Sequence, residues 1–359
     1  MWNCHQRIDI DEQTIPWKGR HKYRCYNPKK PDKFHLKLFA LNDSETGYMS
    51  NFYPYEGKNE QRPPGVTATL YPLVKLLDHD QYKNQGHLLA TDNWYTTMEA
   101  LIFVKKTIGA DYVGTVKANK KSLPKEAIFP KVGRGKKQRG DSKQMRVKLK
   151  NSNDYAYFVA WQDNKPVHIL STLRSYLTAV QRNGYDDARQ WVRRTYSMPT
   201  VISQYNKTMG GTDRFDQNLS YYRPKLKTRS WMTRVLVHLL NACVVNAYII
   251  YKHLYADNLP RGYGLLDYLE LLITGLSYNE TDLEQPSAPS KRTRKQWEHC
   301  YTRLEGVHTP VQRVEKDQKD RNMVRGRCIL CSTRVTYQCI QCDVHLCIQE
   351  MIPGANYNC

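Results

Sequence analysis

Apolar and polar residues alternate in the first part of the chain, which is the period of half-buried β-strands. The alternation is clearest in RIDIDEQTI at residues 7–15, and it recurs twice beyond polar turn residues. Three strands joined by turns, in which neighbours run antiparallel, are therefore expected at residues 7–15, 36–41 and 48–53.

The apolar spacing becomes helical in VTATLYPLVKLLD at residues 66–78. Residues 87–91 then predict a short strand that ends at Asp92, residues 98–107 a second helix, and residues 112–116 another strand. The resulting order, βββαβαβ, is that of the first part of an RNase H-like mixed sheet. We therefore predict an α/β fold with this sheet as its core.

The remainder of the chain divides by composition. Apolar runs at 145–149, 155–161 and 167–170 predict a β-rich insertion into the core, and residues 230–255 predict the longest helix. The expected segments are a core at 1–118 and 201–220, a basic insertion at 119–200, a helical segment at 221–276, a polar linker at 277–325 and a cysteine-rich module at 326–359.

Neither a signal peptide nor a membrane span is expected. The start of the chain has no apolar stretch of signal-peptide length. The most apolar run covers residues 235–251 and includes His238, Asn241 and Asn246, whereas a span needs about 20 mostly apolar residues. A packed amphipathic helix is the favoured interpretation, with no membrane partner.

Charge points to a polyanionic partner. The 359 residues include 55 Lys and Arg against 34 Asp and Glu, a net charge of +21. Residues 117–150 hold 13 basic and two acidic side chains, and RPKLKTR at 223–229 mixes cations with neighbouring aromatics, as surfaces that contact DNA phosphates do. The expected partner is double-stranded DNA, with candidate contacts at Lys136, Lys137, Arg139, Arg223, Lys225, Lys227 and Arg229. For residues 223–229, the alternative is a solvated segment that precedes the following helix and does not contact DNA.

Three aspartates occupy the positions where an RNase H-like core carries catalytic carboxylates. Asp11 lies in the first strand, Asp92 at the end of the fourth, and Asp213 in a later helix. Two-metal phosphodiester chemistry needs converging carboxylates, because Mg²⁺ prefers oxygen ligands. Asp216 is three residues beyond Asp213, on the same helical face, and could assist. A single aspartate at such a position is more often a turn former or a helix cap, and three in this topological order leave both interpretations open.

The cysteines gather at the end of the chain. Two CxxC pairs and nearby residues have the spacing of tetrahedral Zn²⁺ ligands. The candidate ligands are Cys328, Cys331, Cys339, Cys342, His345, Cys347 and Cys359. The alternative is that surplus cysteines pack as small apolar residues.

Short sequences around these positions resemble the piggyBac family of DDE transposases. They occur in order over nearly the whole chain: IDEQ at 10–13, NPKKPDKFHLKLFAL at 27–41, TDNWYTT at 91–97, VGTVKANKKSLP at 113–124, YNKTMGGTDRFDQ at 205–217 and the terminal CxxC cluster. The resemblance implies that Asp11, Asp92 and Asp213 are the catalytic triad and Asp216 its additional acidic residue. It also implies DNA nicking and strand transfer that depend on Mg²⁺ (or Mn²⁺), at transposon ends and TTAA targets.

The chain departs from the family pattern at both ends. The family has a long region before the first catalytic strand, so residues 221–276 are expected to be half of a dimerisation and DNA-binding domain, with a homodimer where the other half is supplied. The family's cross-braced module implies that Cys328, Cys331 and Cys347 share one zinc ion while Cys339 and Cys342 bind another. Glu350 stands where a further ligand is expected, so one complete zinc site is favoured over two.

Two other functions stay open beside that of a transposase or a truncated remnant of one. The first is a non-catalytic, domesticated DNA-binding protein that retains the fold, and the second is an RNase H-like nuclease without strand transfer. KRTRK at residues 291–295 resembles a nuclear import signal, and a nuclear location is expected.

Overall fold

The computed structural model describes residues 2–57, 60–120, 123–124, 126, 128–129, 137–150, 152–185, 191–224 and 226–277, together with short strands after residue 309. Residues 1–270 form one compact unit and residues 271–359 a second. The segments predicted as core, insertion and most of the helical region therefore pack together in the first unit.

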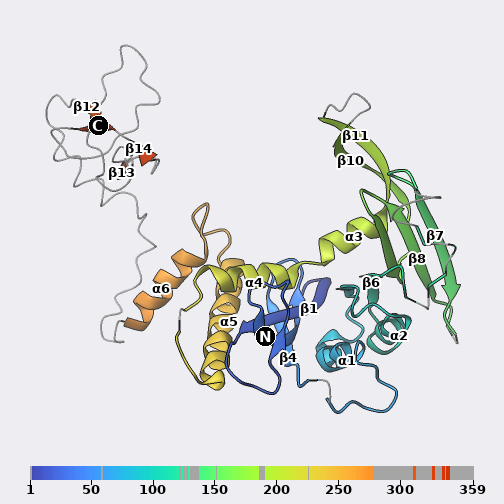
Figure 1. The fold of residues 1–359 in the computed structure, drawn as a ribbon, viewed down its shortest axis with the longest axis horizontal. Coiled ribbons are helices and arrows are strands. Elements are labelled where there is room, and N and C mark those ends of the chain that lie inside the picture. The colour runs from blue at the N-terminus through green and yellow to red at the C-terminus, as the bar shows by residue number, and fades with distance from the viewer. Residues whose placement is uncertain are drawn as a thin grey trace. The chain divides into compact units, whose positions relative to one another are not determined.

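A nine-stranded mixed sheet organises this first unit (Figure 1). Its strands are β1 (Arg7–Pro16), β2 (Cys25–Tyr26), β3 (Phe34–Asp43), β4 (Met49–Pro54), β5 (Leu88–Thr91), β6 (Asp111–Thr115), β7 (Ser142–Lys148), β8 (Tyr155–Gln162) and β9 (Pro166–Ser171). The order is β2-β3-β1-β5-β6-β9-β8-β7, and β4 pairs with the free part of β3. Strands β1, β5 and β6 run parallel, whereas β3 runs antiparallel to β1.

The three strands expected within the insertion extend this same sheet. Strand β9 pairs antiparallel with β6, and β8 and β7 follow outward. A separate hairpin comprises β10 (Leu177–Tyr185) and β11 (Trp191–Pro199). Sequence periodicity did not predict this hairpin, because residues such as QRNGY and RRTYS carry no apolar alternation.

Helices cover both faces of the sheet (Figure 1). One face packs against α1 (Tyr71–Leu77), α2 (Met98–Phe103) and the π-helical turn η2 (Val104–Ile108), around a core that includes Ile10, Leu73 and Leu101. The other face carries α3 (Thr200–Thr208), α4 (Gly211–Tyr221) and α5 (Trp231–Leu254). The remaining elements are the 3-10 turn η1 (Asp80–Tyr82), α6 (Leu265–Ser277), β12 (Pro310–Gln312), β13 (Gly326–Arg327), β14 (Arg334–Val335) and β15 (Tyr337–Cys339).

Helix α5 is 24 residues long, longer than the 17-residue apolar run within it. Among the described helices it is the one long and apolar enough to cross a membrane, by length and composition alone. Its polar residues are nevertheless used within the protein. Asn246 Nδ2 donates to Met49 O (2.9 Å), and its Oδ1 accepts from Met49 N (3.0 Å). Asn241 donates to Leu219 O (3.2 Å), so the inner face of α5 packs on β4 and α4 through hydrogen bonds.

Candidate active site

Strand β1 presents a row of polar side chains to α4. Successive side chains of a strand point to opposite faces. Ile8 and Ile10 enter the core beside α1, so Asp9, Asp11 and Gln13 lie on the α4 side. This row carries the first predicted catalytic residue, Asp11, between two polar side chains that are fully buried.

The parallel pairing of β1 and β5 brings Asp11 beside Asp92. The paired positions run up to Ile10 and Thr91, so Asp11 and Asp92 follow as the next pair along the two strands. Neighbouring strands are about 4.8 Å apart, and paired residues of parallel strands share a face. Asp92 is oriented by its own turn, in which its Oδ1 accepts from the backbone N–H of Trp94 (2.7 Å).

Asp9 anchors the start of the helix that carries Asp213. Its Oδ2 accepts from Thr212 N (3.0 Å), and its Oδ1 accepts from Ser44 Oγ (3.3 Å). A carboxylate at a helix N-terminus also interacts favourably with the helix dipole. A Cβ on Gly211 would lie 2.1 Å from Asp9 Oδ1 and 2.9 Å from the Asp43 carbonyl oxygen, so this close approach requires glycine. Asp213 thus enters from the first turn of α4, anchored directly on β1.

The carboxylates influence one another's protonation. The pKa of Asp11 is raised to about 7, mainly by burial. The negative charges of Asp92, Asp9 and Asp213 contribute to this increase. Burial also raises the pKa of Asp92, with Glu12 the leading charge that adds to the effect. The site therefore has an excess of negative charge in a partly dehydrated setting, which a bound cation would relieve.

Oxygen donors of this kind fit a hard divalent cation such as Mg²⁺. The candidate ligands Asp11, Asp92 and Asp213 come from a strand, a strand end and a helix start, and the charges of Asp92 and Asp213 act on Asp11. Within the described part of the chain, no group of three or more His, Cys, Asp or Glu side chains is gathered closely enough to hold one ion. The arrangement suits ions that take one or two ligands each from the protein and the rest from substrate and water.

Asp216 belongs to a partly buried relay of hydrogen bonds that joins three elements. Gln13 Nε2 on β1 donates to Asp216 Oδ1 (2.6 Å), and Gln13 Oε1 lies 3.1 Å from His238 Nε2 on α5. Because the amide oxygen can only accept, His238 Nε2 must donate to it. Burial lowers the pKa of His238 to about 4, so this imidazole is neutral at pH 7, and burial raises the pKa of Asp216 to about 6.

Glu12, on the opposite face of β1, is held by Lys37. The two side chains form an ion pair at 3.0 Å. The Lys37 ammonium also lies over the rings of Phe39 (4.7 Å), Tyr55 (4.4 Å) and Trp94 (5.3 Å). Trp94 belongs to the turn that orients Asp92, so Lys37 and the rings around it also pack against that turn.

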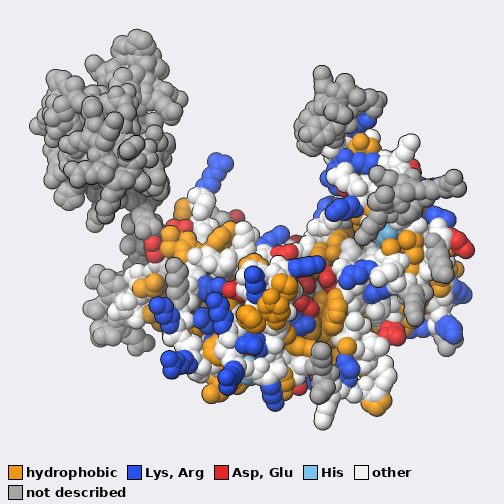
Figure 2. Space-filling view, viewed as in Figure 1, with side chains coloured by type: hydrophobic (Ala, Val, Ile, Leu, Met, Phe, Trp, Pro, Cys, Tyr) orange, Lys and Arg blue, Asp and Glu red, His pale blue; other side chains and the backbone are white. Residues whose placement is uncertain are grey.

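The predicted DNA contacts differ in their surroundings. Lys136 and Lys225 lie outside the described residues, and Lys137 is exposed. Arg139 forms an ion pair with Asp163 (2.6 Å) and lies over the Tyr196 ring (4.9 Å), so it joins the sheet to the β10–β11 hairpin. Exposed cations remain in the segment between α4 and α5, at Arg223, Lys227 and Arg229. Figure 2 shows Lys and Arg side chains spread over one face of the first unit, with acidic side chains among them.

The predicted zinc ligands Cys328, Cys331, Cys342, His345, Cys347 and Cys359 lie outside the described residues, and Cys339 is placed only as backbone at the end of β15. Three free cysteines are described in the first unit, Cys4, Cys25 and Cys243. The zinc prediction therefore stays a prediction.

Sequence reasoning missed Asp9, Gln13 and His238. Asp9 and Gln13 carried a detectable signal, because they flank Asp11 at two-residue intervals and so share its face of the strand. His238 carried none, since its contact with Gln13 joins residues 225 positions apart.

Comparison with known proteins identifies the family that combines this fold with these carboxylates. A family model described as "Transposase IS4", of the DDE transposases, matches residues 1–248. The chain belongs to the piggyBac family of these transposases, as the sequence motifs indicated.

The relatives are distant and longer. Human PiggyBac transposable element-derived protein 3 is 25% identical over 342 residues, which cover 94% of this chain and 53% of that protein. Human PiggyBac transposable element-derived protein 2 is 21% identical over 67% of this chain and 40% of its own length. The chain thus spans about half the length of these relatives or less. In a solved structure, a piggyBac transposase synaptic complex with hairpin DNA, a chain shares the fold with a TM-score of 0.62 and 22% identity, over 96% of this chain and 67% of its own.

Proposed function

We propose that this chain is a piggyBac-type transposase that cuts and joins DNA strands with divalent metal, Mg²⁺ or Mn²⁺, held by Asp11, Asp92 and Asp213. The observation that carries the proposal is the adjacent placement of Asp11, within β1, and Asp92, just beyond the end of the parallel strand β5, with the charge of Asp213 acting on Asp11. The order β4-β3-β1-β5-β6 supports an RNase H-like core, because it is a three-stranded antiparallel unit followed by parallel strands.

Bound divalent cations would supply neutralisation of the phosphodiester charge and activation of the attacking hydroxyl. The chain's own residues provide the positions. The Trp94 backbone N–H orients Asp92, Asp9 holds the start of α4 in place, and the relay through Gln13 holds Asp216. Asp216, whose pKa is about 6, can exchange a proton near neutral pH.

A cleavage assay tests this proposal. The full chain is incubated with duplex DNA that carries a piggyBac-like transposon end next to TTAA, with Mg²⁺ and with EDTA. We expect Mg²⁺-dependent nicking that Asp92→Asn reduces by about 100-fold or more, since loss of one metal-holding carboxylate removes several kcal/mol of transition-state stabilisation. Asp78→Asn, an exposed aspartate paired with Lys83, is the matched control and should keep full activity. Equal nicking by wild type and Asp92→Asn would reject the catalytic assignment.

The human relatives are named as proteins derived from transposable elements, and this favours a second candidate. It is a domesticated DNA-binding protein that retains the fold without catalysis. In that case duplex DNA would be bound equally by wild type and Asp92→Asn, and neither protein would nick it in Mg²⁺. A nuclease without strand transfer would give nicks but no hairpin product.

The remaining assignments are proposals that rest on the family resemblance. They are recognition of TTAA targets, zinc in the cysteine-rich module, a nuclear location through KRTRK at 291–295, and a homodimer where the region that precedes the core in the family is supplied. Metal analysis of freshly purified, reduced protein tests the zinc. A reporter fused to the chain with and without KRTRK tests the nuclear location.

A further inference from the structure

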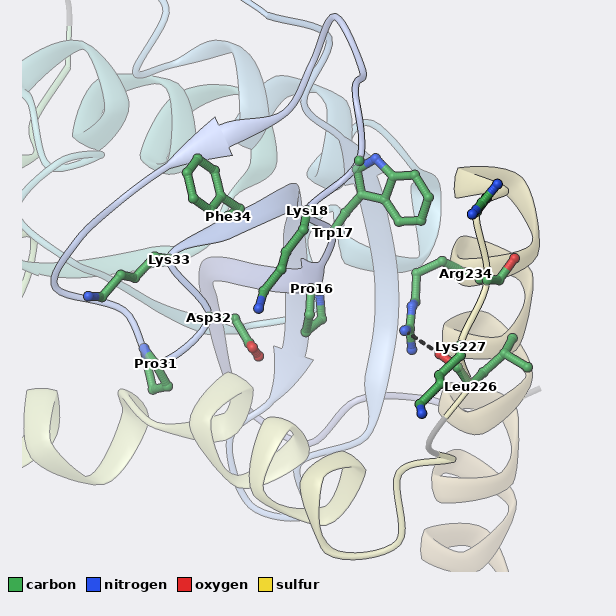
Figure 3. A pocket seen from close by; sticks show the side chains of 13 residues that line it. Pro16, Trp17, Lys18, Pro31, Asp32, Lys33, Phe34, Leu226, Lys227 and Arg234 are labelled. Carbon is green, nitrogen blue, oxygen red and sulfur yellow. Dashed lines mark hydrogen bonds between the residues drawn. The ribbon is translucent and has the colours of Figure 1, made fainter.

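A hollow of about 830 Å³ lies beside the C-terminal end of β1. Its other side is formed by the segment that joins α4 to α5 and by the start of α5. Figure 3 shows its side chains: Pro16, Trp17 and Lys18 from the end of β1, Phe34 from the start of β3, and Leu226, Lys227 and Arg234 from the other side. A volume of this size is within the range of pockets that take small organic molecules.

The hollow is strongly basic. Among its described lining residues, Asp32 is the one acidic side chain, and Arg223 contacts it at 3.5 Å. The cations are Lys18, Lys33, Lys227, Arg229 and Arg234. Five cations against one acid that already has a cationic neighbour make the hollow complementary to an anion.

The hollow also has an exposed aromatic ring, that of Phe34. Phe34 is 37% exposed, and the Arg24 guanidinium lies 4.9 Å from its ring centroid. Tyr26, which lies outside the hollow, is 61% exposed and packs beside Phe34 at 4.8 Å between ring centroids. Contact with a duplex backbone needs only cations, whereas exposed rings beside cations are what unpaired nucleotides stack on.

Hydrogen bonds within the protein hold the rim of the hollow in position before any ligand binds. Arg24 Nη1 donates to the carbonyl oxygens of Lys18 (2.9 Å) and Gly19 (3.0 Å). Trp17 N donates to Phe34 O (3.0 Å), and Arg234 Nη2 donates to Leu226 O (2.6 Å). Binding would therefore not have to order the rim, which favours affinity.

The hollow lies along the same strand as the acidic site. Trp17 is six residues beyond Asp11, a distance of about 20 Å at about 3.3 Å per residue. A strand of B-form DNA covers that distance in about six nucleotides. Arg223 connects the two regions, because it contacts Asp32 in the hollow and its charge acts on Asp216.

We propose that this hollow receives an unpaired nucleotide of the DNA strand that is cut at the acidic site, with the base against Phe34 and the phosphate among the cations. The inference rests on the proposed function and adds a specific ligand, a single-stranded nucleotide, to it. The hollow would hold one nucleotide that is unpaired from its partner strand.

Fluorescence anisotropy in EDTA with the full chain tests the inference. The probes are a blunt duplex and the same duplex extended by a single-stranded overhang of about six nucleotides. We expect roughly tenfold tighter binding of the overhang probe by the wild type, as one stacked base provides. Phe34→Ala should abolish this preference and leave blunt-duplex binding unchanged, whereas Phe34→Tyr should retain it.

Two matched controls separate the hollow from general effects. Phe52→Ala removes an aromatic ring of similar exposure (38%) from β4, outside the hollow, and should keep the preference. Lys33→Glu should weaken binding of the overhang probe more than Lys75→Glu, because both change the net charge equally but only Lys33 lines the hollow.

Equal affinity of the wild type for both probes would overturn the inference, as would equal losses for Phe34→Ala and Phe52→Ala. If either of these results is obtained and the wild type still nicks DNA in Mg²⁺, the proposed function stands and only the nucleotide site in the hollow is rejected. Failure to bind either probe and to nick DNA would reject the proposed function as well.

Discussion

At the scale of single residues, the candidate site stores unfavourable electrostatic free energy. Asp9, Asp11 and Asp216 are buried or half-buried carboxyl groups whose pKa values lie at about 6, 7 and 6. Each holds its proton more tightly in the folded than in the unfolded chain. The folded protein without metal is therefore penalised as pH rises through the interval from about 4 to 7.

Replacement of Asp11 by Asn should stabilise the protein in metal-free buffer. The pKa of Asp11 is raised, so its penalty is absent below about pH 4 and complete above about pH 7. We expect Asp11→Asn to increase the free energy of unfolding by about 1–3 kcal/mol at pH 8 and by little at pH 4. Urea denaturation in EDTA at both pH values measures the difference.

Added Mg²⁺ should raise the Tm of the wild type, because it binds the folded state, and should raise that of Asp11→Asn less. A variant that is less stable than the wild type at pH 8 would contradict the electrostatic account of the site.

Gly211 is the residue whose substitution should most directly displace Asp213. An added Cβ would meet Asp9 Oδ1 and the Asp43 carbonyl, so α4 must shift. We expect Gly211→Ala to cost about 1–3 kcal/mol of stability, as overpacking does, and to reduce Mg²⁺-dependent nicking. Gly275→Ala is the control, because no described atom lies within 4 Å of its added Cβ. Chemical denaturation and the cleavage assay should separate the two variants.

At the scale of elements, β1 links α5 to α4. The relay from His238 through Gln13 to Asp216 crosses α5, β1 and α4 and makes their positions interdependent. A shift of α5 would therefore be transmitted to Asp216. The outer face of α5 exposes Met232, Leu236 and Leu240.

The neutral state of His238 should make folding sensitive to acid. Its pKa of about 4 lies below the ordinary 6.5, so the unfolded chain takes up a proton first as pH falls. The stabilising contribution is complete above about pH 6.5 and is lost as pH falls towards 4. His238→Gln removes this titration, so the stability difference between wild type and variant should shrink by about 1–3 kcal/mol from pH 7 to pH 4.5. Parallel urea denaturation series at the two pH values measure it, and an unchanged difference would show that His238 does not titrate as inferred.

At the scale of the whole molecule, a net charge of +21 should dominate association with DNA. Each neutralised phosphate contributes about −0.9 to the slope of log affinity against log salt concentration. We expect steep salt dependence for a blunt duplex, and we expect Arg229→Ala to reduce the slope by about 1. Anisotropy titrations over a range of salt concentrations provide the measurement. Binding that does not depend on salt would refute the electrostatic contribution.

Much of the fold could be predicted from the sequence because it depends on local periodicity. The strand at residues 7–15, the helix that became α5 and the strands of the insertion all carry patterns that burial on one face requires. Helix α1 begins at Tyr71, later than the pattern that starts at residue 66, because Pro72 suits the first turn and the preceding residues form turns.

The sequence by itself determined the family and the succession of strands and helices in the core, and it singled out three candidate aspartates, since each depends on residues that are close together or on motifs that can be read directly. Only the tertiary structure decided which neighbours act on those aspartates. Asp9 meets Thr212, and Gln13 meets Asp216 and His238, across more than 200 residues of sequence. The hollow beside β1 likewise combines residues 16–34 with residues 226–234. Contacts of this kind depend on how strands and helices are arranged in space, and local periodicity carries no information about them.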